Sequence, residues 1–330
     1  MKKNKFLNVL LVLIIILFIT IMLSLLFGGV SIKLKDVLIG LFGNDNSKYE
    51  IIMKQIRLPR IIAAIIAGVG LSISGLILQN ITSNTLASPN IIGVNSGAGL
   101  FVILTLSCIP SIILLLPIIS FVGAFLTTLL IILIANKVGK SKVTIILAGM
   151  VVTTLLNAVI SLISLIDTDV LVSYNYFSIG GLNGVSYDNI ILPGILIISV
   201  LLSTIFISKD LDVISLGDEV ATSLGVNVSR TKIIALILAS LSAACVVSFA
   251  GLLGFVGLMV PHIVRKLIGN NTRKSLIVSV LVGSILVLVA DLLGRVVVAP
   301  SEVPVGIIMA LVGAPFFLIL LLKGGNHVRS

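Results

Sequence analysis

The chain has 330 residues, of which 58% are hydrophobic and only 10% are charged. This balance excludes an ordinary soluble domain, and repeated apolar runs of about 20 residues are typical of transmembrane helices. The net charge of +10 does not indicate nucleic-acid binding, because the basic residues gather between apolar runs in a membrane-topology pattern. With only two histidines, and with both cysteines in apolar runs, neither a metal centre nor a disulfide framework is expected.

Ten apolar segments predict an all-α polytopic membrane protein, which we expect to form one transmembrane domain over residues 1–330. The first segment, Phe6–Phe27, follows a basic start but is longer than the apolar core of a typical signal peptide, so a retained span is favoured. An even number of spans would place both chain ends on one side of the membrane. The other nine predicted spans are Leu58–Ile81, Ile91–Ile109, Ile112–Ala135, Val143–Ile166, Ile190–Ser208, Ile233–Ala250, Gly254–Ile268, Ser275–Val298 and Val305–Leu322.

The distribution of lysine and arginine predicts which side that is. With the chain ends inside, the inner segments carry 15 basic residues and the outer segments carry 7. Because cytoplasmic loops are enriched in basic residues, both termini are expected in the cytoplasm. The long polar segment Gly28–Ile56 then lies outside, and the loop Lys209–Lys232 lies in the cytoplasm.

Two of the predicted spans begin with weakly similar sequences. Residues 60–68 (RIIAAIIAG) open the second span, and residues 232–240 (KIIALILAS) open the seventh. The two spans would cross the membrane in opposite directions, which suits an inverted repeat of the kind common in transporters. A chance match between two apolar sequences is the alternative.

The loop Lys209–Lys232 is the longest polar interruption in the second half of the chain. Ser215 is placed to cap a short helix over about Leu216–Leu224, and Gly225 is a natural C-terminal stop. Acids in the first turn would suit the helix dipole. Such a helix either rests on its own membrane domain or docks on a cytoplasmic partner, and we favour docking. The acids of the loop are Asp210, Asp212, Asp218 and Glu219.

Charged residues also occur at the outer ends of two predicted spans. Asp291 and Arg295 are four residues apart, so they share a helix face and are expected to form an intramembrane ion pair. Arg57 and Arg60 open the second span against the positive-inside bias, and we expect both to be exposed. They either snorkel to the membrane interface or dock an acidic partner, since the arginine fork matches carboxylates.

Two further patterns have plain interpretations. Gly139-Lys140-Ser141 resembles the end of a phosphate-binding loop, but Ile134 stands where the motif requires its first glycine, so ATP binding is not expected. Small residues crowd particular spans, for example over Gly68–Gly75. We interpret them as close helix packing, with direct lining of a transport path as the alternative.

Several motifs occur in order from Arg57 to Lys323. They read RLPR at 57–60, LQ at 78–79, NTLASPNIIGVNSG at 84–97, GGLNG at 180–184, LGDEVATSLG at 216–225, GFVGLMVPH at 254–262, EVPVG at 302–306 and GAPF at 313–316. In this combination the chain resembles the FecCD-like permease family of iron–siderophore, haem and cobalamin ABC importers. It departs from the family pattern at position 85, which is threonine where the family more often has proline.

The resemblance implies ten spans per subunit and two permease subunits, identical or different, around a central path. It implies that two cytoplasmic ATPases dock on the loop between the sixth and seventh spans, and that a substrate-binding protein docks outside. Arginines matching Arg57, Arg60 and Arg295 would face glutamates of that binding protein. The fifth span and the short outer helix after it, about Tyr174–Leu182, would line the path. The residues implied for ATPase coupling are Leu216, Gly217, Asp218, Glu219, Leu224 and Gly225.

The residues and the resemblance together predict a transport subunit of a bacterial plasma-membrane importer. It would not be an enzyme and would hold no cofactor, because ATP hydrolysis would belong to a separate chain. An iron–siderophore chelate is the expected substrate, with haem or cobalamin as the alternative. An ion-coupled secondary transporter is the alternative of another class, but it would need several intramembrane acids, and Asp291 is the only clear one in the sequence.

Overall fold

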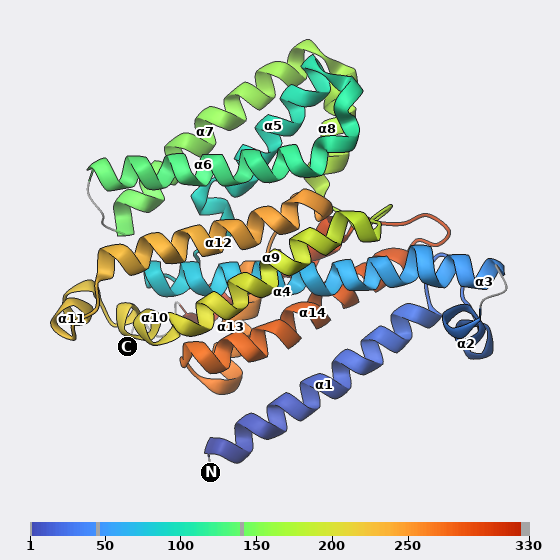
Figure 1. Ribbon diagram of the computed structural model, residues 1–330, viewed down its shortest axis with the longest axis horizontal. Coiled ribbons are helices and arrows are strands. Elements are labelled where there is room, and N and C mark those ends of the chain that lie inside the picture. The colour runs from blue at the N-terminus through green and yellow to red at the C-terminus, as the bar shows by residue number, and fades with distance from the viewer. Residues whose placement is uncertain (1, 44–46, 139–141, 325–330) are drawn as a thin grey trace.

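A computed structural model describes residues 2–43, 47–138 and 142–324, and within these ranges the chain forms helices and no strands (Figure 1). The motif Gly139-Lys140-Ser141 lies outside the described residues. The α-helices are α1 (Lys2–Leu26), α2 (Leu34–Phe42), α3 (Lys48–Ile51), α4 (Leu58–Thr82), α5 (Val94–Cys108), α6 (Leu116–Val138), α7 (Lys142–Ile166), α8 (Thr168–Ile179), α9 (Tyr187–Phe206), α10 (Ser208–Ser215), α11 (Asp218–Ser223), α12 (Val228–Ala250), α13 (Val256–Ile268), α14 (Thr272–Val296) and α15 (Val305–Gly324). Short π- or 3-10-helical segments are η1 (Ile52–Arg57), η2 (Pro89–Ile92) and η3 (Pro110–Leu115).

Each of the ten predicted spans corresponds to a helix. In the described part of the chain, seven helical stretches are long and apolar enough to cross a membrane. This confirms an all-helical, multi-pass membrane protein. The helices α5 and α13 and the apolar part of α15 are shorter than the other spans. The number of ten spans therefore stays a prediction.

The short helices of two polar segments lie at opposite ends of the molecule (Figure 1). We call these ends the α11 end, where α10 and α11 lie, and the α2 end, where α2 and α3 lie. The first helix, α1, begins at the α11 end and finishes near α2. The start of α1 and the loop Lys209–Lys232 thus lie toward the same end of the molecule, as the topology prediction requires. Which end is cytoplasmic stays a prediction.

The central helix of the larger part of the molecule is α4, which packs against α9, α12, α13 and α14 (Figure 1). Glycines make two of these contacts unusually close. A Cβ atom at Gly68 would lie 2.2 Å from the carbonyl oxygen of Gly283 in α14, and one at Gly75 would lie 1.8 Å from that of Gly257 in α13. The small residues of this span therefore serve helix packing, as predicted.

The helices α4 and α12 run in opposite directions and pack against each other (Figure 1). Ser242 Oγ donates to the carbonyl oxygen of Gly70 at 2.9 Å, and Ser74 Oγ donates to that of Ala239 at 2.7 Å. Gly70 and Ser242 are 172 residues apart, the same offset that separates the two similar segments 60–68 and 232–240. A two-fold axis between inverted repeats would bring equivalent positions together in this way, so the contact favours the repeat, which stays a prediction.

The helices α5 to α8 form a second group, separated from α4 and α14 by α12 (Figure 1). Within this group α5 and α6 approach closely, since a Cβ atom at Gly97 would lie 2.5 Å from the carbonyl oxygen of Gly123. Large apolar side chains of α7, among them Leu155 and Leu162, are exposed on the outside of the group. Such a surface suits lipid or another membrane-embedded chain rather than water.

The segment Gly28–Ile56, expected to be a long polar stretch, is largely helical. It contains α2, α3 and most of η1, and α3, η1 and α4 form one continuous helical stretch of 35 residues, Lys48–Thr82. At about 1.5 Å per residue this stretch is longer than a hydrocarbon core of about 30 Å, so one end extends beyond that core. The helix α2 was missed because nine residues are too few to be recognised as a span.

Candidate docking and coupling sites

A buried charged cluster joins α4, α14 and the segment that follows α14. Arg60 Nε donates to Asp291 Oδ1 at 2.8 Å, and Arg60 Nη1 donates to Glu302 Oε2 at 2.7 Å. The Asp291 side chain is fully buried, with 0% exposure. A carboxylate at that depth requires a paired positive charge. The Arg60–Asp291 contact therefore fixes the start of α4 against the last turns of α14.

Arg295 supplies the second positive charge beside Asp291. Its Nε atom lies 3.0 Å from Asp291 Oδ2, so the structure contains the ion pair that the four-residue spacing predicts. The approach lacks the direction of a hydrogen bond. The guanidinium also donates to the Ser24 hydroxyl and, at 3.3 Å, to the Ser24 carbonyl oxygen. Arg295 thereby ties α1 to α14.

The arginines predicted for docking are buried, so the expectation that Arg57 and Arg60 are exposed was wrong. Arg57, Arg60 and Arg295 are 5%, 8% and 3% exposed. Arg57 donates to the carbonyl oxygens of Leu25 and Val30, which belong to the end of α1 and the turn after it. This turn covers the guanidinium groups, since a Cβ atom at Gly28 would lie 3.4 Å from Arg295 Nη1 and 3.6 Å from Arg57 Nη2. The docking role itself stays a prediction.

At the other end of the molecule, the predicted helix Leu216–Leu224 is shorter than expected. It begins only at Asp218, because α10 extends to Ser215 and Gly217 occupies the N-cap position of α11 with φ +129°. That backbone angle is rare for any residue except glycine. The expectation that Ser215 caps α11 was wrong, since its hydroxyl donates to the carbonyl oxygen of Asp212 within α10, at 2.6 Å.

The helix α11 presents an apolar row to the outside. Leu216 just before α11, Val220 within it and Leu224 just after it are 69%, 44% and 64% exposed, and we call these three side chains the apolar row. On its inner side Ala221 is buried, and Asp218 Oδ2 accepts a hydrogen bond from Lys232 Nζ of α12 at 2.6 Å. The apolar row thus faces away from the membrane domain. A helix that merely rested on that domain would bury these side chains.

The end of α11 matches the prediction for Gly225. Gly225 has φ +85°, its N–H donates to the carbonyl oxygen of Thr222, and the N–H of Val226 donates to that of Ala221 at 3.0 Å. These bonds satisfy the last carbonyl groups of the helix. Apart from its neighbours along the chain, no atom of the described residues lies within 4 Å of a Cβ atom placed at Gly225, so a side chain there would be opposed by backbone conformation and not by packing.

The helix α10 connects α11 to the core through buried polar contacts that we call the inner junction. Asp212 Oδ1 accepts a hydrogen bond from the backbone N–H of Thr272, the first residue of α14, at 2.8 Å. Thr272 Oγ1 in turn accepts from Asn80 Nδ2 of α4 at 2.8 Å. Leu211 and Ile214 of α10 are fully buried beside these contacts. A displacement of α10 must therefore act on α4 and α14 directly.

The segment Tyr174–Leu182, implied to line the path, joins the ends of three helices. The N–H of Gly181 donates to the carbonyl oxygen of Ala250 at 2.9 Å, where α12 ends, and the N–H of Gly306 in α15 donates to that of Gly180 at 3.1 Å. A Cβ atom at Gly306 would lie 1.7 Å from the Ile179 carbonyl oxygen. These contacts fix the segment against α12 and α15, whereas its role along a path stays a prediction.

Sequence reasoning did not assign a role to three residues of these sites: Glu302, Asp212 and Asn80. Glu302 contacts an arginine 242 residues away, and Asn80 contacts a threonine 192 residues away. No local spacing reports contacts at such separations. The available signals in the sequence were the position of Glu302 in the motif EVPVG at 302–306 and that of Asp212 in the polar loop Lys209–Lys232.

Comparison with known proteins gives a consistent result over nearly the whole chain. The model of the FecCD transport family matches residues 15–323. The Fe(3+)-citrate import system permease protein YfmD of Bacillus subtilis is 40% identical over 92% of this chain and 91% of its own length. The iron(3+)-hydroxamate import system permease protein FhuG of the same organism is 36% identical over 98% of each chain.

A haem-related protein and a solved structure are also similar. The "Probable heme-iron transport system permease protein IsdF" of Staphylococcus aureus is 34% identical over 99% of both chains. A solved inward-facing structure of a transporter assigned to the metal-chelate type of ABC transporter superposes with a TM-score of 0.84. It shares 29% identity and covers 96% of this chain and 99% of its own. The chain therefore belongs to the FecCD transport family.

Proposed function

We propose that this chain is the permease subunit of a binding-protein-dependent ABC importer that carries an iron–siderophore chelate inward. Two of the relatives are named for import of iron as citrate and hydroxamate chelates, and a third for haem iron. Iron in chelated form is common to all three names. Haem, or cobalamin as implied by the family resemblance, is the alternative cargo.

The apolar row of α11 is the observation that carries the proposal. Leu216, Val220 and Leu224 are exposed at the end of the molecule from which α1 starts, on and beside a helix too short to enter a membrane. An exposed apolar row on a fixed helix is typical of a docking surface. A cytoplasmic ATPase with a complementary groove would cover it.

Movement of the ATPases would reach the membrane helices through the inner junction. Asp212 holds the start of α14, and Thr272 holds the end of α4 through Asn80. The same two helices are joined near their other ends by Arg60 and Asp291 and touch between these points at Gly68. We infer that α4 and α14 move as one body when α11 is displaced, which would drive the change between outward- and inward-open states.

The charged cluster would serve the substrate-binding protein through its exposed edge. Glu302 is its most accessible member, with 28% side-chain exposure, while the arginines lie beneath it. A glutamate of the binding protein that approached Arg60 would compete with Glu302 for the same guanidinium. Docking through these arginines therefore requires that the contact between Glu302 and Arg60 open.

The remaining partners follow from the exposed apolar surfaces. Membrane lipid and a second permease subunit, identical or different, would cover the apolar side chains of α7 that face outward. An ion-coupled carrier is disfavoured by the state of Asp291, because its buried carboxylate is paired with two arginines and is not free to take up an ion.

Binding of the purified ATPase to permease variants tests the proposal. Leu216→Glu with Leu224→Glu places two charges in the apolar row and should weaken ATPase binding by at least 10-fold, or about 1.4 kcal/mol. Thr222→Glu changes an exposed residue of the same helix outside the row and should leave binding near wild type. Unchanged ATPase binding in the double variant would remove α11 as the docking helix.

A further inference from the structure

The helix α2 has one face packed on the protein and a second face that is apolar and largely exposed. Gly40 is pressed against α3 and η1, since a Cβ atom there would lie 2.6 Å from the Tyr49 carbonyl oxygen and 2.7 Å from the Met53 side chain. Val37 is buried on the same side. Lys54 Nζ donates to the carbonyl oxygen of Gly43 at 3.0 Å, which holds the end of α2. The orientation of α2 is therefore fixed.

The other face of α2 is apolar and exposed. Leu34, Leu38 and Phe42 follow one another at intervals of four residues and are 59%, 50% and 82% exposed, and Ile39 beside them is 40% exposed. A row of large apolar side chains on an immobile helix is unfavourable in water. An environment other than water must cover this face.

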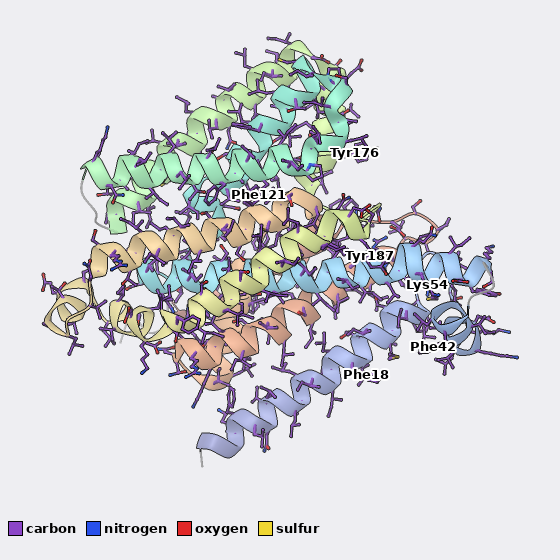
Figure 2. The ribbon with its side chains drawn as sticks, in the orientation of Figure 1. Phe18, Phe42, Lys54, Phe121, Tyr176 and Tyr187 are labelled. Atoms are coloured by element: carbon purple, nitrogen blue, oxygen red, sulfur yellow. The ribbon has the colours of Figure 1, made fainter. Side chains whose placement is uncertain are left out.

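The position of α2 identifies that environment. Figure 1 places α2 just beyond the end of α1, and Figure 2 shows the labelled Phe42 there and Phe18 further back along α1. Phe18 is 60% exposed on a helix long and apolar enough to cross a membrane, so lipid acyl chains are the environment expected around it. Exposed Phe27 and Val30 continue the apolar surface from α1 towards α2. The exposed face of α2 thus continues a surface that is expected to contact lipid.

Two exposed lysines, Lys33 and Lys35, lie at the start of α2. Long cationic side chains at a membrane surface reach headgroup phosphates while their stems contact apolar groups. Apolar residues on one face and lysines at its edge are typical of a helix that lies in the membrane interface. We propose that α2 lies in this interface, with Leu34, Leu38 and Phe42 among lipid acyl chains and the two lysines at lipid phosphates.

The absence of tryptophan from the sequence allows a direct test. Phe42→Trp creates a single fluorescent reporter in the full-length permease, which would be reconstituted in nanodiscs of phosphatidylcholine and phosphatidylglycerol. Lipids brominated near the headgroup or near the chain end then measure the depth of the indole. We expect strong quenching by the shallow bromines and weak quenching by the deep bromines. Leu38→Trp repeats the measurement should the first variant fold poorly.

The matched control is Leu216→Trp, a similarly exposed leucine just before α11, which should remain unquenched by either lipid. If Phe42→Trp and Leu38→Trp are quenched no more than this control, α2 does not contact lipid and the proposal is wrong. If the tryptophan is not quenched by the brominated lipids but its emission changes when the substrate-binding protein is added, the exposed face of α2 is a protein-docking surface and the proposal is wrong. The test does not depend on transport activity, so it is independent of the proposed function.

Discussion

Replacing Asp291 with asparagine removes the carboxylate that lies between Arg60 and Arg295, while it keeps the size of the side chain. Breaking a buried ion pair by removal of one partner costs about 3–5 kcal/mol, because the remaining charge is left uncompensated. Arg60 would keep Glu302 at 2.7 Å and Arg295 would keep the oxygens of Ser24. We therefore expect the lower end of that range, about 3 kcal/mol of lost unfolding free energy.

The control is Glu302→Gln, which removes a carboxylate from the same cluster at a position with 28% side-chain exposure. Solvent screens this pair, so its loss should cost about 1 kcal/mol or less. The free energy of unfolding would be measured by titration from mild detergent into a denaturing detergent, followed by circular dichroism. Adding Arg295→Gln to Asp291→Asn should recover part of the loss by removing a surplus positive charge. Equal losses for Asp291→Asn and Glu302→Gln would refute the burial argument.

Three further predictions concern glycine conformation, the inner junction and helix packing. Gly225→Val should cost about 1 kcal/mol at the end of α11 and reduce stimulation of ATP hydrolysis by the loaded binding protein, measured in proteoliposomes; normal stimulation would show that this helix end is not required. Asp212→Ala should lower transport per ATP hydrolysed, whereas Asp212→Asn, which keeps an acceptor for the Thr272 N–H, should retain most of it; equal loss in both variants would contradict the hydrogen-bond role. Gly75→Val should prevent accumulation of monodisperse protein, because its Cβ would collide with the Gly257 backbone, while Gly254→Ala should be tolerated; similar size-exclusion profiles would argue against the tight contact.

Much of the helical plan could be predicted from apolar runs alone. Each predicted span has a helix, because a stretch of about 20 apolar residues can satisfy its backbone in lipid only as a helix. The Gly225 stop and the Asp291–Arg295 pair were predictable for a related reason. Both depend on residues within one helix or turn, where spacing along the chain fixes spacing in space.

The errors share the opposite cause. Ser215 looked like an N-cap from its neighbours, but packing of Leu211 and Ile214 into the core extends α10 as far as Ser215. The burial of Arg57 depends on the turn after α1, which lies about 30 residues earlier in the chain. Local patterns carry no information on such contacts, and a charged residue at a span end is ordinarily expected to reach water.

The source of energy for transport tests the central claim most directly. The permease would be reconstituted in vesicles with its ATPase and a loaded binding protein, and entry of a radiolabelled ferric siderophore would be followed. Uptake should require ATP on the side of the membrane that carries the ATPase, and it should persist when proton and sodium gradients are collapsed. It should be lost in the double variant Leu216→Glu with Leu224→Glu. Uptake that continues without the ATPase and follows an ion gradient would contradict the assignment as an ABC permease.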